Sequence, residues 1–163
     1  MSRDFDAEVA STNYAGPVHA SSVVIEGKAV LICGPSGSGK SDLALRLIDR
    51  GATLLCDDRT HISCNGDILI AKPMPNITGL LEVRGLGLIC FPHCMKAPIA
   101  MIVRLLDHQD SAPERMPQRL PSHTLCGIEI PVLSLHGFEA TAPLKIELAM
   151  KGYPHQIESM EPL

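Results

Sequence analysis

Runs of apolar residues alternate along the chain with short polar or glycine-rich segments, and their spacing predicts alternating strands and helices. Residues 18–25 and 29–33 are strand-like and are joined by a turn at 26–28. The second run is uniformly apolar, as a strand covered on both faces should be. Apolar residues at helical spacing then predict a helix from about Lys40 to Arg50, followed by a short buried strand at 53–56.

The second half of the chain predicts more strands and one more helix. A hairpin is expected over 62–70, with its turn at Asn65-Gly66, and a central strand over 99–106. Residues 108–122 contain three prolines among charged residues and predict a surface loop. A strand at 128–135 and a short helix at 144–150 follow. The order of strand, loop, helix and strand indicates the α/β class, with a mixed sheet flanked by helices.

Length and charge narrow the class of protein. The 163 residues and 17.5 kDa suit one domain, expected at 17–163, behind a polar leader at 1–16 that we expect to be disordered. The net charge of −4 and the lack of a run of Lys or Arg argue against a nucleic-acid partner. We find no secretion signal and no stretch of about 20 apolar residues, so we expect no membrane contact and a cytoplasmic location.

The cysteines are predicted to be reduced core thiols. Two of the six, Cys33 and Cys56, lie inside apolar strand-like runs, where a free cysteine behaves as a small hydrophobic residue. Cys90, His93 and Cys94 form a cluster with thiolate and imidazole ligands, but their spacing matches no zinc template. The sequence therefore predicts no zinc site there.

The glycine-rich segment after the second strand fits the P-loop pattern G-x-x-x-x-G-K-[ST]. An apolar strand precedes it and an amphipathic helix follows it, as a P-loop requires. Its backbone N–H groups can surround phosphate oxygens at a helix N-terminus, Lys40 can neutralise the β and γ phosphates, and the Ser41 hydroxyl can bind Mg²⁺. The predicted nucleotide-binding residues are Gly34, Pro35, Ser36, Gly37, Ser38, Gly39, Lys40 and Ser41.

Two carboxylates end the next strand. Asp57 and Asp58 stand where a strand parallel to the one before the P-loop would place them beside the phosphates. One carboxylate suits Mg²⁺, which takes oxygen ligands, and the other could take a proton from an attacking hydroxyl. The alternative is a solvated pair that caps a strand. The P-loop favours the functional interpretation.

These motifs together resemble the catalytic domain of the HPr kinase/phosphorylase family. The resemblance rests on the P-loop, on Asp57-Asp58, and on the segment 79–89, which contains Glu82, Arg84 and paired glycines like that family's signature segment. His19 stands fifteen residues ahead of Gly34, where the family has a histidine near the transferred phosphate. The match covers most of 18–115.

The resemblance implies a reaction and a role for each residue. A family member uses ATP and Mg²⁺ to phosphorylate a serine of the phosphocarrier protein HPr, and the same site can reverse the modification with inorganic phosphate. Asp58 would be the base, Lys40 would hold phosphates, and His19 would contact the phosphoryl group. Ser41 and Glu82 would bind Mg²⁺, and Asp57 would assist through water.

Other implications concern the later part of the chain. The family has an arginine in a mobile loop, for which we prefer Arg115 over Arg119. Its arginine-rich segment tied to dephosphorylation corresponds here to 135–140, which lacks arginine, so the reverse reaction stays open. The sequence shows no match to the separate N-terminal domain of longer members, so the resemblance implies the short form found in some proteobacteria. The family also implies a homo-oligomer, commonly a hexamer.

Two other functions fit part of the pattern. A small-molecule kinase can also be built on one P-loop domain, although the proline-rich loop around Arg115 lacks an arginine-rich lid with helices of its own. A nucleotide-binding sensor without transfer activity is the second alternative. Asp58 discriminates, because a protein that only binds nucleotide needs no base.

Overall fold

The computed structural model describes residues 15–153, so the predicted leader at 1–16 lies almost wholly outside the described residues. Eleven strands, two α-helices and one short 3₁₀ helix are assigned within that range. In chain order they are β1 (Gly16–Val18), β2 (Ser21–Ile25), β3 (Lys28–Cys33), α2 (Lys40–Asp49), β4 (Thr53–Cys56), β5 (Thr60–Asn65), β6 (Ile68–Pro73), η1 (Pro75–Ile77), β7 (Leu80–Val83), β8 (Gly87–Cys90), β9 (Ala97–Leu105), β10 (Ser122–Leu125), β11 (Ile128–Leu135) and α3 (Ala142–Met150).

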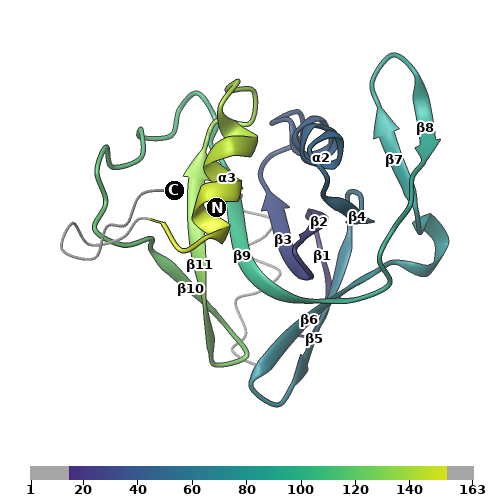
Figure 1. Cartoon of the computed structure of the whole chain (residues 1–163), viewed down its shortest axis with the longest axis horizontal. Helices are drawn as coiled ribbons and strands as arrows, with labels where there is room; N and C mark the ends of the chain where they lie inside the picture. The colour runs from purple at the N-terminus through teal and green to yellow at the C-terminus, as the bar shows by residue number, and fades with distance from the viewer. Residues whose placement is uncertain (1–14, 154–163) are drawn as a thin grey trace.

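The predicted α/β class with a mixed sheet is confirmed. Nine strands form one curled sheet in the order β1-β5-β6-β9-β3-β2-β4, and β11, carrying β10, joins it through β9 (Figure 1). β3, β9 and β11 run parallel to one another. Their carboxyl ends therefore open at the same edge, which is where ligands bind in open α/β sheets.

The segment 18–25, predicted as one strand, is two strands. β1 pairs with β5, whereas β2 pairs with β3 and β4. The chain bends between them, and the Ala20 N–H donates to the Val18 carbonyl at 3.0 Å. Residues 18–25 mix apolar side chains with His19, Ser21 and Ser22 and are almost all buried, so their pattern gives no sign of the break. His19 lies at the corner.

β4, which Asp57 directly follows, is not the direct neighbour of β3, the strand before the P-loop. β2 lies between β3 and β4 and is antiparallel to both, so β3 and β4 are parallel but one strand apart. β4 still runs in the predicted direction, so Asp57 and Asp58 lie at the same edge of the sheet as the P-loop. The intervening strand adds its own first residue, Ser21, to that edge.

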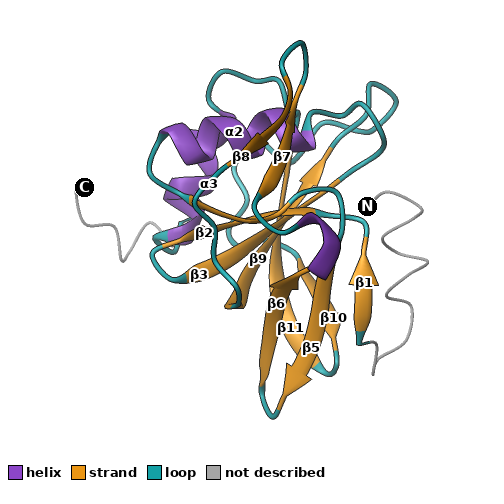
Figure 2. Cartoon of the chain, turned by 90° about the vertical axis from the view of Figure 1, so that its right-hand side faces the viewer, coloured by secondary structure: helices purple, strands orange, loops and turns teal. Residues whose placement is uncertain are grey.

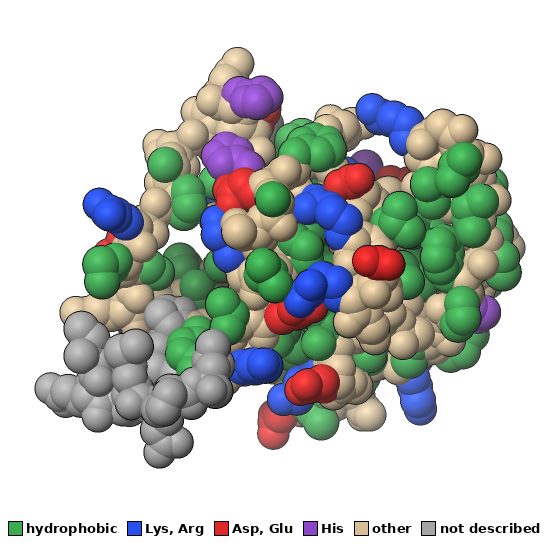
Figure 3. All heavy atoms as spheres, turned by 45° about the horizontal axis from the view of Figure 1, so that its top comes forward, with side chains coloured by type: hydrophobic (Ala, Val, Ile, Leu, Met, Phe, Trp, Pro, Cys, Tyr) green, Lys and Arg blue, Asp and Glu red, His purple; other side chains and the backbone are tan. Residues whose placement is uncertain are grey.

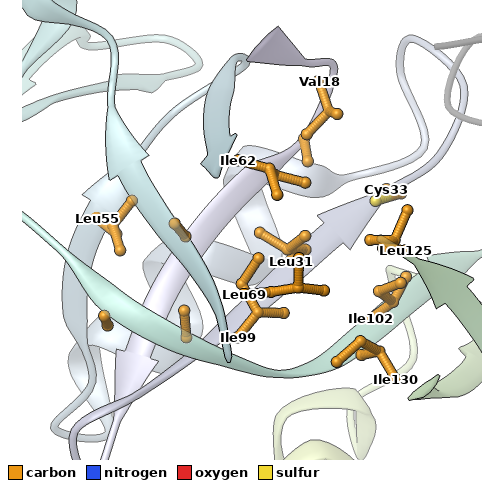
Figure 4. Packing of buried hydrophobic residues seen from close by; sticks show 14 of the residues in the cluster. Val18, Leu31, Cys33, Leu55, Ile62, Leu69, Ile99, Ile102, Leu125 and Ile130 are labelled. Atoms are coloured by element: carbon orange, nitrogen blue, oxygen red, sulfur yellow. The ribbon is translucent and has the colours of Figure 1, made fainter. Parts of the chain in front are cut away.

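Both helices cover one face of the sheet. α2 and α3 share a buried apolar cluster with residues of β2, β3, β4, β9 and β11. The opposite face packs against parts of the same curled sheet, chiefly β5, β6, β10 and β11, in a cluster of aliphatic side chains that includes Leu31, Ile62 and Ile102 (Figure 4). None of the helices in residues 15–153 is long and apolar enough to cross a membrane.

Two pairs of strands were not expected from the pattern. β7 and β8 form a separate antiparallel hairpin over the signature segment, and this hairpin stands out from the body of the domain (Figure 2). β10 pairs with β11 in an antiparallel hairpin. The sequence predicted a loop as far as Ser122 and no strand before β11. The glycines and the short apolar runs in these segments give no strong period, so neither hairpin had a local signal.

The prediction that all the cysteines are reduced thiols is wrong for one pair. Cys64, at the end of β5, forms a disulfide with Cys126 in the β10–β11 turn. The two lie 62 positions apart, so their proximity depends on the tertiary fold. Cys33 and Cys56 are buried thiols that form no disulfide, as predicted. Burial raises the pKa of the Cys56 thiol, which donates to the Arg59 carbonyl.

Candidate active site

The P-loop forms as predicted between β3 and α2. Gly39 is the N-cap residue of α2 with φ of 96°, and no side chain caps the helix. The first amides of α2 are thus left for an anion, which the helix dipole also favours. Lys40 is buried and its Nζ donates to the carbonyls of Gly34 and Pro35, at 3.0 and 3.1 Å, within the same loop.

The loop is packed closely against the residues that follow β11. A methyl group on Gly137 would lie 2.3 Å from the Ser38 carbonyl oxygen, so no larger residue fits there without displacing the loop. The Ser38 hydroxyl is buried and has no hydrogen-bond partner among the described residues. A buried polar group without a partner is uncommon, and a bound ligand would satisfy it.

Asp57 is the centre of the polar network beside the P-loop. Its side chain is buried, and Oδ1 accepts hydrogen bonds from the hydroxyls of Ser21 and Ser41, both at 2.8 Å, and from the Asp58 N–H at 3.0 Å. Oδ2 accepts from the Glu82 N–H at 3.1 Å. The network therefore joins β2, α2, the end of β4 and β7.

Asp58 points out of this network toward solvent. Its φ of 63° is left-handed, a conformation that aspartate tolerates better than most residues. The side chain is 68% exposed, and Oδ1 lies 2.7 Å from His19 Nε2, a hydrogen bond that the carboxylate accepts. The bend before β2 and the strained residue after β4 thus bring together two predicted catalytic side chains from separate segments.

A cavity of about 430 Å³ opens between the P-loop and the β7–β8 hairpin. Lys40, Ser41, Asp58, Glu82 and Arg84 are among the residues that line it. Arg84 makes no hydrogen bond or ion pair to a described residue, so it does not lock the signature segment to a carboxylate. The Arg84 side chain instead lines the cavity. On the end of the molecule that carries α2, blue basic and red acidic side chains are interspersed and form no single basic patch (Figure 3).

The donor set fits a magnesium ion that is shared with a nucleotide. Asp57 is buried and forms no ion pair with a described residue, and the Ser41 hydroxyl, which donates to it, keeps its lone pairs for a cation. No three His, Cys, Asp or Glu side chains in residues 15–153 gather closely enough to hold a metal alone. Mg²⁺ commonly takes one or two carboxylates and completes its shell with phosphates and water.

Arg115 is the one predicted catalytic residue that the structure does not bring to the site. It is exposed in the long segment between β9 and β10, as is Arg119, and neither lines the cavity beside Lys40. Its placement at the phosphates stays a prediction.

Phe138 is a candidate functional residue that sequence reasoning did not select. Its side chain is 66% exposed, yet its ring lies over the P-loop, close enough that a methyl group on Gly39 would be 3.1 Å from it. Phe138 lines the cavity beside Lys40 and also a second cavity on the other side of the loop. An exposed aromatic residue directly after a glycine is a weak signal, because its position against the P-loop depends on the tertiary fold.

Comparison with known proteins agrees with this geometry. Residues 11–137 match the family described as HPr Serine kinase C-terminal domain. This chain belongs to that family. The family's matched region contains the P-loop, the Asp57-Asp58 pair and the β7–β8 hairpin, and it ends at Gly137, next to Phe138.

Two relatives support the assignment. The chain is 32% identical over 126 residues to a protein named HPr kinase/phosphorylase from Prosthecochloris aestuarii, and the match covers 72% of this chain and 37% of that protein. The chain thus spans little more than a third of that relative. A solved structure of the Hpr(Ser) kinase/phosphatase from Coxiella burnetii has a TM-score of 0.74 and 26% identity, covering 84% of this chain and 95% of that one.

Proposed function

We propose that this protein transfers the γ-phosphoryl group of ATP, with Mg²⁺, to a serine of HPr or an HPr-like carrier protein. The observation that carries the proposal is the His19–Asp58 pair at the mouth of the P-loop cavity, with Nε2 and Oδ1 2.7 Å apart. A site that only bound nucleotide would need no exposed carboxylate there. Family membership and the names of the two relatives support the choice of substrate.

Asp58 is the proposed base. Its exposed carboxylate can accept the proton of a serine hydroxyl that enters from solvent, while His19 holds the carboxylate in place. The serine oxygen then forms a bond to the γ-phosphorus, and the bond from that phosphorus to the β,γ-bridging oxygen breaks. ADP is the leaving group. In phosphoryl transfer, most of the rate comes from positioning and charge neutralisation.

Phosphoryl transfer needs groups that neutralise the phosphates and hold Mg²⁺. We assign the first role to the ammonium group of Lys40 and the second to the network around the Asp57 carboxylate. The Lys40 Nζ donates to two backbone carbonyls, and we propose that it would exchange them for the β and γ phosphates when nucleotide binds. The Ser41 hydroxyl would bind Mg²⁺, with Glu82 as a carboxylate ligand and Asp57 acting through water. The ion would neutralise charge on the leaving phosphates. We also propose that Arg115 reaches the phosphates from its loop once substrate is bound.

The same atoms support the reverse reaction in principle. A protonated Asp58 can return its proton to the serine oxygen while inorganic phosphate attacks the phosphoserine phosphorus, which gives pyrophosphate. One relative is named as a phosphorylase as well as a kinase, and the other as a phosphatase as well as a kinase. Because the reaction needs ATP, we propose the cytoplasm as its compartment. We further propose a homo-oligomer, commonly a hexamer in the resembled family, which light scattering on the purified protein tests.

The decisive measurement is transfer of labelled γ-phosphate from Mg·ATP to purified HPr. We expect the parent to label serine and Asp58→Asn to lose roughly 10²- to 10⁴-fold in rate, the contribution of a general base. Asp67→Asn is a matched control, because Asp67 is an exposed aspartate in the β5–β6 turn.

Binding of ATP separates the alternatives. Asp58→Asn should bind Mg·ATP as tightly as the parent, since the variant lacks only the proton acceptor. Equal labelling of HPr by the parent and Asp58→Asn would refute the role of Asp58. Tight ATP binding by the parent with no labelling of HPr would instead favour a small-molecule kinase or a nucleotide sensor.

A further inference from the structure

A second cavity lies against the P-loop, on the side away from the His19–Asp58 pair. Its volume is about 380 Å³, within the range of small-molecule sites, about 300–1,000 Å³. Its walls are the outer side of the P-loop, the residues directly after β9, and the residues directly after β11. These are the carboxyl ends of three neighbouring parallel strands. None of the proposed catalytic residues lines it.

We propose that this cavity holds the nucleoside part of the nucleotide, with the base against the ring of Phe138 and the ribose hydroxyls on Asp107. The proposal rests on the proposed function in so far as that function puts the γ-phosphate near Asp58. A nucleoside triphosphate is a linear chain of groups, so its other end must leave the P-loop on the opposite side. The two cavities share Ser36, Gly37 and Phe138, so one molecule can extend through both.

The aromatic ring of Phe138 is largely accessible to a ligand. Its side chain is 66% exposed while its ring rests on Gly39, so one face contacts the loop and the other is available to a ligand. Exposure of a large aromatic side chain costs free energy that stacking on a base would recover. Every base offers a π-face, and base–aromatic stacking contributes about 1–3 kcal/mol per base.

The turn that carries Phe138 is fixed before any ligand binds. Arg46 of α2 donates to the carbonyls of Gly137 and Glu139, and it also pairs with Asp42 on its own helix. The Glu139 carboxylate accepts from the His136 N–H at 3.2 Å and from Lys145 of α3. Since both helices hold this turn, the ring needs no large rearrangement to receive a base.

Asp107 offers a carboxylate to the cavity. Its Oδ1 accepts from the His108 N–H at 2.7 Å, and its own N–H donates to Asp110 Oδ2 at 2.7 Å, so the short turn after β9 is closed. The second carboxylate oxygen of Asp107 has no hydrogen-bond partner in residues 15–153. Ribose hydroxyls are donors that such an oxygen would accept.

The test compares binding of Mg·ATP with binding of Mg·tripolyphosphate, which has the phosphates but no nucleoside. For Phe138→Ala we expect ATP to bind roughly 5- to 150-fold more weakly, the range that stacking supplies, and tripolyphosphate to bind unchanged. Ile68→Ala, which removes an exposed apolar side chain in the β5–β6 hairpin, is the control and should change neither.

Two further variants report on the same cavity by other means. The chain contains no tryptophan, so Phe138→Trp introduces a single tryptophan whose emission should change with Mg·ATP but not with Mg·tripolyphosphate. Asp107→Asn should weaken the binding of ATP several-fold. The variant should bind dideoxy-ATP, which lacks both ribose hydroxyls, nearly as tightly as it binds ATP.

The outcomes separate this proposal from the proposed function. Equal weakening of ATP and tripolyphosphate in Phe138→Ala would show that the ring only supports the P-loop and would overturn the nucleoside site, as would no weakening of either. Selective weakening of ATP with no transfer to HPr by the parent would retain the nucleoside site and remove HPr as the substrate. A parent that binds no ATP would overturn both proposals.

Discussion

The two sides of the P-loop are built on different physical principles. On the side of Asp58, hydrogen bonds from four segments converge on the buried carboxylate of Asp57, and charged side chains line the cavity. On the side of Phe138, close packing of Gly137 on Ser38 and one exposed ring define the shape. The first side is suited to stabilise charge, and the second to hold a neutral group by contact. The two should therefore respond to different kinds of substitution.

The largest effect should come from the side that handles charge. Lys40→Ala removes the ammonium group that would neutralise the phosphates, so we expect loss of turnover by a hundredfold or more in a phosphotransfer assay. Lys72→Ala, at an exposed lysine on β6, is the control and should leave the rate unchanged. Parent-like turnover in Lys40→Ala would contradict the assignment of the P-loop.

Gly137→Ala tests whether the two sides share one backbone contact. The new methyl group would lie 2.3 Å from the Ser38 carbonyl, so the loop must shift, at the upper end of the 1–3 kcal/mol that overpacking typically costs. Thermal unfolding should show the loss of stability, and calorimetry should show weaker binding of both Mg·ATP and Mg·tripolyphosphate. His136→Ala, in the same turn, should weaken tripolyphosphate binding less. An unchanged affinity for tripolyphosphate in Gly137→Ala would show that the two sides are independent.

Ser21→Ala is a milder change confined to the charge-handling side. It removes one of the donors to Asp57 and leaves Ser41 in place, so the carboxylate becomes less well oriented. A hydrogen bond to a charged group is worth about 1.5–3 kcal/mol, and we expect the Mg²⁺ concentration for half-maximal activity to rise several-fold. Thermal unfolding, measured in parallel, identifies a general loss of stability. A parent-like Mg²⁺ titration would remove Ser21 from the metal network.

The smallest effect concerns pH and the turn that carries Phe138. The hydrogen bond from Lys145 is the main cause that holds the pKa of Glu139 below its usual value of 4.5. A lowered carboxyl pKa contributes stability above the usual value, and this contribution is lost as the pH falls through the folded-state pKa. At neutral pH we expect Glu139→Gln to melt about 1–3 °C lower than the parent, and the gap should close in acid. A gap that widened in acid would contradict this sign.

The charge-handling side could be predicted from the sequence, whereas most of the other side could not. The P-loop is a local motif, so Lys40 and Ser41 were found from adjacent residues. The family resemblance selected His19 and Asp58 separately, and their hydrogen bond to each other was not predicted. Phe138 had no local signal, because its role depends on packing between segments about 100 positions apart. The same reason explains the disulfide between Cys64 and Cys126, which the sequence analysis did not anticipate.

The fold shows the same limit. The alternation of apolar runs predicted β3, α2, β4 and β11 closely, because each has a clear period or a sharp boundary. It merged β1 with β2, since burial on both faces hides a bend. It also missed β2 as the strand between β3 and β4, since strand order depends on pairing that no local pattern records.

The hydrogen bonds of Asp57 also have a consequence for how the chain becomes active during folding. They join residues separated by 36, 16 and 25 positions, so they close long loops and are expected to form late, after those loops have lost their conformational entropy. A nascent or partly unfolded chain would hold the P-loop sequence without the metal network. On the proposed function, phosphotransfer would then be confined to molecules that have completed the fold.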